Sequence, residues 1–276
     1  MYASIDNKTD SDDSTVIWRY MDFAKFFELI STSTLFFARL TALRDDLWEG
    51  RLTSMNLSST WQEKMAQLLF DSLPPSSHRQ FTLKDYTSLL KGTVDILNRG
   101  DHVRHTLAVS CWSLCDDESD SFWKIYPGSK NGLAIRTTIG ALKQSVDHQM
   151  RTVQCGKVTY KDYTNDAIMP VTPENLTVHK RKCFEYEREY RGIVWEGETN
   201  KKMVSPMKFT NDAGDKVPVV LQDLIGTLFI SPYADNWFHE VISSAMSKFG
   251  FAFPIEPSKV LKSPDNSKSD VTFRTQ

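Results

Sequence analysis

Hydrophobic residues near the start of the chain form first a nearly continuous run and then a series with the wider spacing of helices. Residues 16–20 form a largely apolar run that predicts a first strand. Asp22 can cap a following helix, because its carboxylate accepts hydrogen bonds from free backbone N–H groups, and apolar residues recur at helical spacing up to Ile30. A short strand is expected at 35–38, and a charged loop at 44–50 follows it.

The next apolar pattern is helical in two consecutive segments. Residues 60–63, Thr-Trp-Gln-Glu, match the capping-box pattern, so a helix is expected from there to residue 69 or 73. A second helix is expected at 82–97 from its helical spacing of apolar residues. The sequence therefore predicts a helical insert at about 55–100.

Short strand patterns dominate the rest of the chain. They cover 106–112, 132–137, 153–160, 187–195 and 227–231. Helices are expected at 138–146 and after Asp235, which can serve as a cap. Strands without regularly alternating helices are typical of α+β folds, here with a compact mixed or antiparallel sheet. We expect a single domain over 16–260 that carries the insert, with flexible tails at 1–15 and 262–276.

Composition narrows the class of protein. The formal net charge of −2 over 276 residues gives no bulk electrostatic reason to bind nucleic acid or an anionic membrane. No apolar run approaches the roughly 18 residues that a membrane span needs. The four cysteines show no dense, regular spacing, and the polar N-terminus has no apolar signal core. We therefore expect a soluble, cytoplasmic protein without a membrane partner.

The segment 184–191, Phe-Glu-Tyr-Glu-Arg-Glu-Tyr-Arg, carries the most informative polar pattern. On a strand, Glu187, Glu189 and Arg191 would share one face. Two neighbouring carboxylates repel, which raises the proton affinity of one of them unless a cation such as Arg191 compensates. This arrangement suits catalysis or polar ligand binding. The alternative is an exposed edge strand whose charges prevent pairing with other chains.

Other candidate residues precede this segment. Ser110 and Ser113 lie at the end of an apolar strand, although one regular strand would point them to opposite faces. Trp123 and Tyr126 would be neighbours on a short helix, where they either stack a flat ring or belong to the core. Arg19 needs an anionic partner if it points inward, and otherwise it lies in water.

The sequence contains neither the usual zinc-ligand spacings nor the common nucleotide-binding and hydrolase motifs. His102, His105, Cys111 and Cys115 do not have the usual zinc-ligand spacings, so no structural zinc site is expected from them. The chain also lacks the phosphate-binding loop, the Rossmann glycine pattern, the zincin motif and the nucleophile elbow.

The order of these motifs resembles a bacterial family of domains of unknown function. The matching elements are Arg19-Tyr20, the loop 45–49, Ser110 to Ser113, 122–126 and 187–191, together with strands at 132–135 and 158–160. The resemblance covers residues 16–260. The loop 45–49 lacks the Asn and Pro of the family pattern, and about 55–100 has no counterpart.

The order Arg, Ser-x-x-Ser, Glu-x-Glu is also similar to that of ADP-ribosyltransferases, and this second resemblance implies an NAD-binding site. Glu189 would then be catalytic and Glu187 would assist it, because a fixed carboxylate stabilises the positive charge that develops when the glycosidic bond breaks. The residues that would bind NAD are Arg19, Tyr20, Ser110, Ser113, Trp123, Tyr126 and Arg191.

Three functions follow from these patterns. The first is an NAD-consuming transferase or glycohydrolase, acting as a stress or anti-phage effector on a protein or nucleic-acid target. The second is a metal-dependent nuclease in which Glu187, Glu189, Asp46 and Glu49 would gather a divalent ion. The third is a non-catalytic sensor or interaction module of a defence system, with the Glu-x-Glu-x-Arg strand as a structural ion-pair ladder. The oligomeric state and the target are left open.

Overall fold

Most strands of the protein belong to one sheet that branches at its centre. The computed structural model describes residues 2–4, 12–43, 45–74, 76, 78, 80–99, 101–127, 130–147, 152–197 and 208–261. The strands are β1 (Tyr2–Ser4), β2 (Val16–Asp22), β3 (Thr34–Arg39), β4 (Leu107–Leu114), β5 (Gly132–Thr138), β6 (Val153–Lys157), β7 (Thr159–Lys161), β8 (His179–Arg181), β9 (Glu189–Trp195), β10 (Gly214–Pro218), β11 (Thr227–Ile230) and β12 (Ile255–Pro257).

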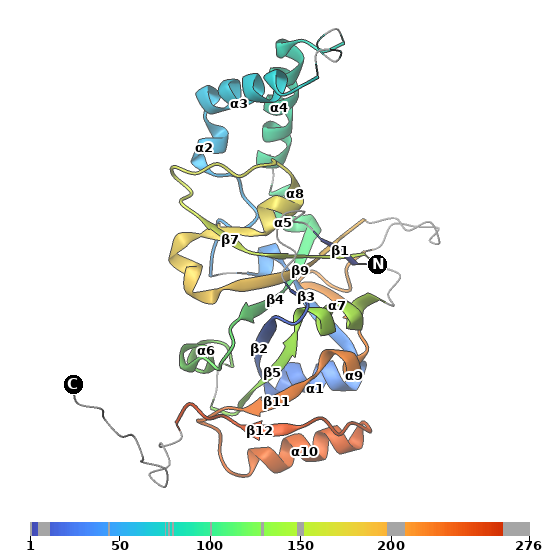
Figure 1. Ribbon diagram of the computed structural model, residues 1–276. Coiled ribbons are helices and arrows are strands. Elements are labelled where there is room, and N and C mark those ends of the chain that lie inside the picture. The colour runs from blue at the N-terminus through green and yellow to red at the C-terminus, as the bar shows by residue number, and fades with distance from the viewer. Residues whose placement is uncertain are drawn as a thin grey trace, which may run out of the picture.

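Helices cover the sheet and extend beyond one end of it (Figure 1). The α-helices are α1 (Phe23–Thr32), α2 (Ser54–Leu57), α3 (Ser59–Asp71), α4 (Leu83–Asn98), α5 (His102–Thr106), α6 (Asp120–Ile125), α7 (Ile139–Asp147), α8 (Pro173–Thr177), α9 (Leu221–Leu224) and α10 (Phe238–Lys248). Two 3₁₀ helices, η1 (Leu40–Ala42) and η3 (Lys182–Glu187), complete the described elements.

The branch in the sheet arises because β4 changes partners along one of its edges. The ten-stranded sheet runs in the order β1-β6-β9-β4-β2-β5-β11-β12, with β3 pairing both β4 and β10. β9 pairs β4 over its length, but on the opposite edge β3 pairs only near Val109 and β2 only near Ser113. β2 and β3, which helix α1 connects, therefore separate from each other along this edge of β4.

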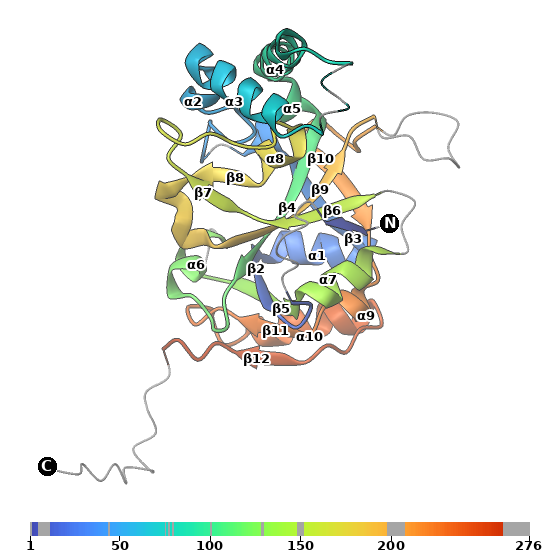
Figure 2. The same ribbon diagram turned by 45° about the horizontal axis from the view of Figure 1, so that its top comes forward.

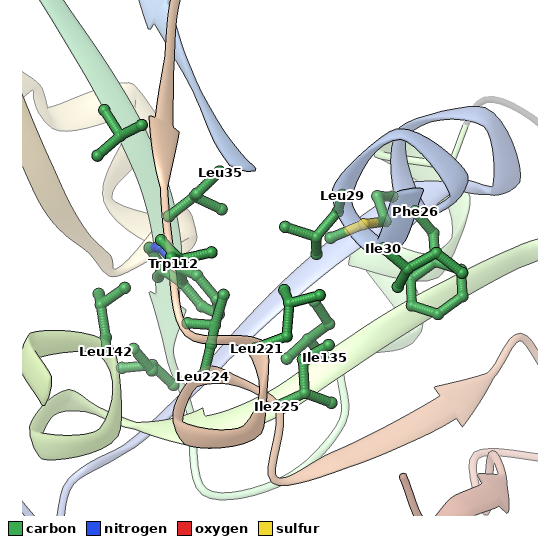
Figure 3. Packing of buried hydrophobic residues seen from close by; sticks show 14 of the residues in the cluster. Phe26, Leu29, Ile30, Leu35, Trp112, Ile135, Leu142, Leu221, Leu224 and Ile225 are labelled. Atoms are coloured by element: carbon green, nitrogen blue, oxygen red, sulfur yellow. The ribbon is translucent and has the colours of Figure 1, made fainter. Parts of the chain in front are cut away.

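The two faces of β4 and β9 contribute to different hydrophobic cores. Ala108 and Val194 belong to the largest core, which joins the sheet to α1, α7, α9 and α10. Figure 3 shows part of it, including Phe26 of α1 and Leu224 of α9. Val109 and Ile193 belong to a second core on the other face, because successive side chains of a strand alternate. Each face of the central strands is therefore covered.

The helical segment between residues 54 and 106 closes the second core. Ala66 of α3, Leu90 and Val94 of α4 and Val103 of α5 are buried in it, and α3 packs against α4. Figures 1 and 2 show α3 and α4 at the end of the molecule farthest from β12. Among the described residues, no helix is both long and apolar enough to cross a membrane.

Comparison with the predicted elements confirms the α+β class with a mixed, mostly antiparallel sheet. Asp22 does cap α1, accepting a hydrogen bond from the Lys25 N–H at 2.8 Å. The predicted cap of α3 is wrong, because α3 begins one residue before Thr60 and Ser58 caps it. The side chain of Asp235 also makes no cap, since the chain turns once more before α10 begins.

Two further boundaries differ from the predictions. The strand expected at 153–160 is divided into β6 and β7, and β7 leaves the large sheet to pair in parallel with β8. In the predicted N-terminal tail, β1 pairs in parallel with β6. Residues 5–11, Arg44 of the charged loop and the predicted tail 262–276 lie outside the described residues.

Candidate functional site

A cavity of about 460 Å³ lies at the branch of the sheet. Lys25 and Leu29 of α1 line it on the face of the largest core, whereas Cys111 and Glu189 line it on the opposite face. The cavity therefore passes through the gap that β2 and β3 leave beside β4. Its volume is in the range of small-molecule binding sites.

Five charged side chains form a buried cluster at one end of the cavity. Lys180 Nζ contacts Glu49 Oε1 at 2.9 Å, Glu187 Oε2 at 2.6 Å and Glu189 Oε1 at 2.9 Å. Arg191 Nε contacts Glu189 Oε2 at 2.6 Å, and its Nη2 contacts Glu49 Oε1 at 3.1 Å. Three carboxylates thus face two cations, which leaves one formal negative charge when all five groups are ionised.

Glu187 enters this cluster from a 3₁₀ helix and not from the predicted strand. It is the last residue of η3, and Arg188 after it adopts a left-handed conformation with φ of 44° before β9 begins at Glu189. The prediction that Glu187 shares a strand face with Glu189 is therefore wrong, because Glu187 lies before the strand begins. The turn nevertheless brings the two carboxyl groups together, and both meet Lys180.

The position of Glu49 in the cluster depends on a sharp turn in the charged loop that follows β3 and η1. Gly50 has a φ of 73°, in the left-handed region that favours glycine. A Cβ atom at this position would lie 2.8 Å from Leu40 Cδ1. Asp46 fixes the start of the turn, because its Oδ1 accepts hydrogen bonds from the Trp48 N–H and from Arg181.

The two carboxyl groups of the β9 region have opposite protonation preferences. Burial and hydrogen bonding to Glu189 raise the pKa of Glu187 to about 8. Burial also opposes ionisation of Glu189, but Arg191, the hydrogen bond from Glu187 and Lys180 outweigh it and lower the pKa of Glu189 well below its usual range. At neutral pH one proton on Glu187 therefore removes the excess negative charge of the cluster.

Arg19 lies in the gap of the sheet and has no acidic partner among the described residues. Its guanidinium donates to the Ser110 hydroxyl and, at 3.2 Å, to the Phe36 carbonyl of β3. It lies 5.6 Å from the centroid of the Trp112 ring. Burial lowers the pKa of Arg19 to about 10, so it stays charged at neutral pH. Among the described residues, no carboxylate forms an ion pair with it.

The predicted aromatic residues divide between the cavity and the core. Tyr126 is 39% exposed and lines the cavity, where burial, Glu187 and Glu189 raise its pKa. Trp123 is buried outside the lining, against Tyr20 at 4.8 Å between ring centroids. Tyr20 also lines the cavity and accepts a hydrogen bond from the Ser119 N–H at 2.9 Å.

The two serines face opposite sides of β4, as strand alternation predicts. Ser113 lies opposite Glu189 and lines the cavity, where its hydroxyl donates to the Glu187 carbonyl at 3.2 Å. Ser110 is on the other side and holds Arg19, without lining the cavity itself. Of the nine predicted site residues, Ser110 and Trp123 alone are outside the lining.

The sequence patterns did not identify Lys180 as a site residue, although it is the central cation of the cluster. It lies on β8, which is positioned by parallel pairing with β7 about twenty residues earlier in the chain. The only local sign is the triplet His-Lys-Arg at 179–181, which also fits an exposed loop. A buried lysine of this kind is found only by knowing which strand it pairs with.

The carboxylates predicted for a divalent ion do meet here, because Asp46, Glu49, Glu187 and Glu189 all line the cavity. Lys180, Arg191 and, at Asp46, Arg181 already occupy oxygens of these groups. No group of three or more His, Cys, Asp or Glu side chains in the described part of the chain is placed to hold a metal ion.

The two family resemblances inferred from the sequence are based only on the motifs named in the sequence analysis. Comparison of the chain with protein-family models, with curated proteins and with solved structures finds no match.

Proposed function

We propose that the protein binds NAD or a related nucleotide in the cavity and cleaves or transfers the bond between its ribose and base. The observation that carries this proposal is the charge arrangement of a single cavity. One part holds Arg19, which has no acidic partner in the described part of the chain, and another holds an ionised carboxylate, Glu189, beside a protonated one, Glu187.

Arg19 supplies the anion-binding part of the proposed site. A charge that is partly removed from water is costly unless it is paired, and among the described residues only neutral oxygens and an aromatic ring contact the half-buried guanidinium. A phosphate group would supply the missing negative charge and could accept two parallel hydrogen bonds. The diphosphate of a dinucleotide fits this requirement.

The carboxylate cluster supplies the reactive part. When the glycosidic bond breaks, the bonding electrons leave with the neutral nicotinamide, and positive charge develops on the ribosyl carbon. Glu189, held ionised by Arg191 and Lys180, would stabilise that charge. Water or a target nucleophile then forms the new bond, and its proton would pass to Glu187 in its ionised form. The rate should therefore rise with pH through about 8.

The experiment that tests this proposal measures NAD loss and nicotinamide release by the purified protein between pH 6 and 9. Wild type is expected to consume NAD, Glu187→Gln to lose the rise near pH 8, and Glu189→Gln to lose turnover. Glu185→Gln is the matched control, because Glu185 is exposed on the same 3₁₀ helix and does not line the cavity. Unchanged turnover in both variants would refute the proposed roles.

A non-catalytic ligand-binding module is the second candidate, and one observation favours it. Every carboxylate of the cluster contacts a cation of the protein, as in a structural ion-pair network. This candidate predicts that NAD raises the melting temperature without being consumed. A role as a stress or anti-phage effector, or as the sensor of such a system, stays a prediction.

A further inference from the structure

Helix α4 carries an apolar stripe on the side that none of the described elements covers. Its inner side is buried through Leu90 and Val94. On the outer side, Leu89 is 67% exposed and Ile96 is 65% exposed. These are the two most exposed large hydrophobic side chains among the described residues, and they lie seven residues apart on one helix. Scattered exposed leucines are ordinary, but an aligned pair on one helix indicates a contact surface.

The residues around this pair repeat with the spacing of a helix–helix seam. Steps of four, three, four and three residues connect Asp85, Leu89, Gly92 and Ile96 of α4 with Arg99, the residue that directly follows the helix as its C-cap. A mean step of 3.5 residues keeps side chains in line along a second helix. Gly92 is at the centre, and a Cβ atom built there would meet nothing within 4 Å. The glycine therefore leaves room for another helix to approach closely.

The stripe is complementary to itself when a second copy runs in the opposite direction. With the two Gly92 residues facing each other, Asp85 of each copy lies opposite Arg99 of the other, and Leu89 lies beside Ile96. Arg99 forms no ion pair with the described residues of its own chain, and hydrogen bonds from Thr82 lower the pKa of Asp85 and keep it ionised. A parallel arrangement would instead place like charges together.

We propose that the protein forms an antiparallel homodimer through the outer stripe of α4, with Gly92 on the twofold axis. The helical pair α3–α4 lies at one end of the molecule, so a second copy can reach α4 without meeting the sheet (Figures 1 and 2). The stripe runs over the 15 residues 85–99, and its two ends lie about 21 Å apart along the helix axis. An interface of this size is small, and the expected dissociation constant is in the micromolar range.

The first test is sedimentation equilibrium of the full chain from about 1 to 200 µM, a range that brackets the expected dissociation constant. Wild type should change from monomer to dimer over this range. Gly92→Gln should stay monomeric while its melting temperature rises, because glutamine favours helix more than glycine does. Leu89→Gln combined with Ile96→Gln should also stay monomeric. Leu261→Gln, which removes a leucine that is 61% exposed and lies outside α4, should dimerise as wild type does.

The second test fixes the direction of the helices by oxidation in a Cys183→Ser background, since Cys183 is the exposed free cysteine. Gly92→Cys should form a crosslinked dimer with oxidised glutathione. Ile96→Cys should not, because two copies of position 96 would lie about 12 Å apart along the axis, beyond the reach of a disulfide. A wild type that is monomeric at 200 µM, a dimer that survives Gly92→Gln, a crosslink at position 96 or none at position 92 would each overturn the proposal.

Discussion

The charged side chains at the two ends of the cavity differ in whether opposite charges of the protein balance them. At the carboxylate end, Lys180 and Arg191 together make five ion-pair contacts to Glu49, Glu187 and Glu189, and a proton on Glu187 balances the remainder. At the other end, Arg19 contacts a hydroxyl, a carbonyl and an aromatic ring, and none of the carboxylates that the structure describes balances its charge.

This difference separates charges that the fold needs from a charge that a ligand can use. A compensated cluster is expensive to disturb, because removal of one member leaves its partners buried and unpaired. An uncompensated cation leaves no buried anion behind when it is removed. Mutation at the two ends should therefore change different quantities, namely stability at the carboxylate end and ligand affinity at Arg19.

Arg191→Met should have the largest effect on stability. Arg191 is fully buried, and its loss would leave Glu189 Oε2 without its cation and the Thr177 carbonyl without its donor. We expect the free energy of unfolding to fall by about 3–5 kcal/mol, the usual cost of breaking a buried ion pair from one side. Urea denaturation measures this change.

Lys124→Met is the matched control for that experiment. Lys124 forms an equally short contact with Asp120, 2.6 Å, but both side chains are exposed to solvent. Its replacement should leave the urea midpoint unchanged. If Arg191→Met were as stable as Lys124→Met, the cluster would not be the structural element described above.

Gly50→Ala should have the next largest effect, because the turn that carries Glu49 requires a positive φ. The left-handed conformation alone costs alanine about 1–2 kcal/mol, and the new methyl group would also clash with Leu40. Gly250→Ala is the control, since Gly250 has a φ of 77° and open space around it. Thermal unfolding should show a greater loss for Gly50→Ala, and equal losses would show that Leu40 gives way freely.

The raised pKa of Glu187 should appear in the pH dependence of stability. In the unfolded chain Glu187 ionises near pH 4.5, but in the folded protein it ionises near 8. Between these values the folded state binds the extra proton, so this group makes the protein less stable as pH rises. The slope for one proton is about 1.4 kcal/mol per pH unit at most. Glu187→Gln should remove this slope between pH 5 and 8, as measured by urea unfolding, and an unchanged slope would place the proton elsewhere.

Local sequence signals predicted much of the fold around the site. The pattern of residues 16–38 predicted β2, α1 and β3, because apolar spacing and the Asp22 cap agree. Alternation along β4 and β9 also predicted that Ser110 and Ser113 point apart and that Glu189 and Arg191 share a face. The cap of α3 was harder, since both Ser58 and Thr60 are residues that start helices.

The remaining features depend on long-range pairing that one sequence does not reveal. Lys180 reaches the carboxylates only because β8 pairs with β7, and the cavity exists only because β4 changes partners between Val109 and Ser113. Glu187 depends on the left-handed turn at Arg188, which no glycine marks. The sequence therefore indicated most of the polar residues of the site, but not the cation that joins them.

The smallest stability change and the largest binding change should both come from Arg19. The most direct test of the account is the NAD-induced rise in melting temperature of wild type, of Arg19→Gln and of Arg136→Gln. Arg136 is a half-buried arginine of β5 that lies near Trp18 but does not line the cavity. We expect Arg19→Gln to melt close to wild type without ligand and to lose the NAD-induced rise, while Arg136→Gln keeps it. A full NAD-induced rise in Arg19→Gln would contradict the claim that the uncompensated cation binds the ligand.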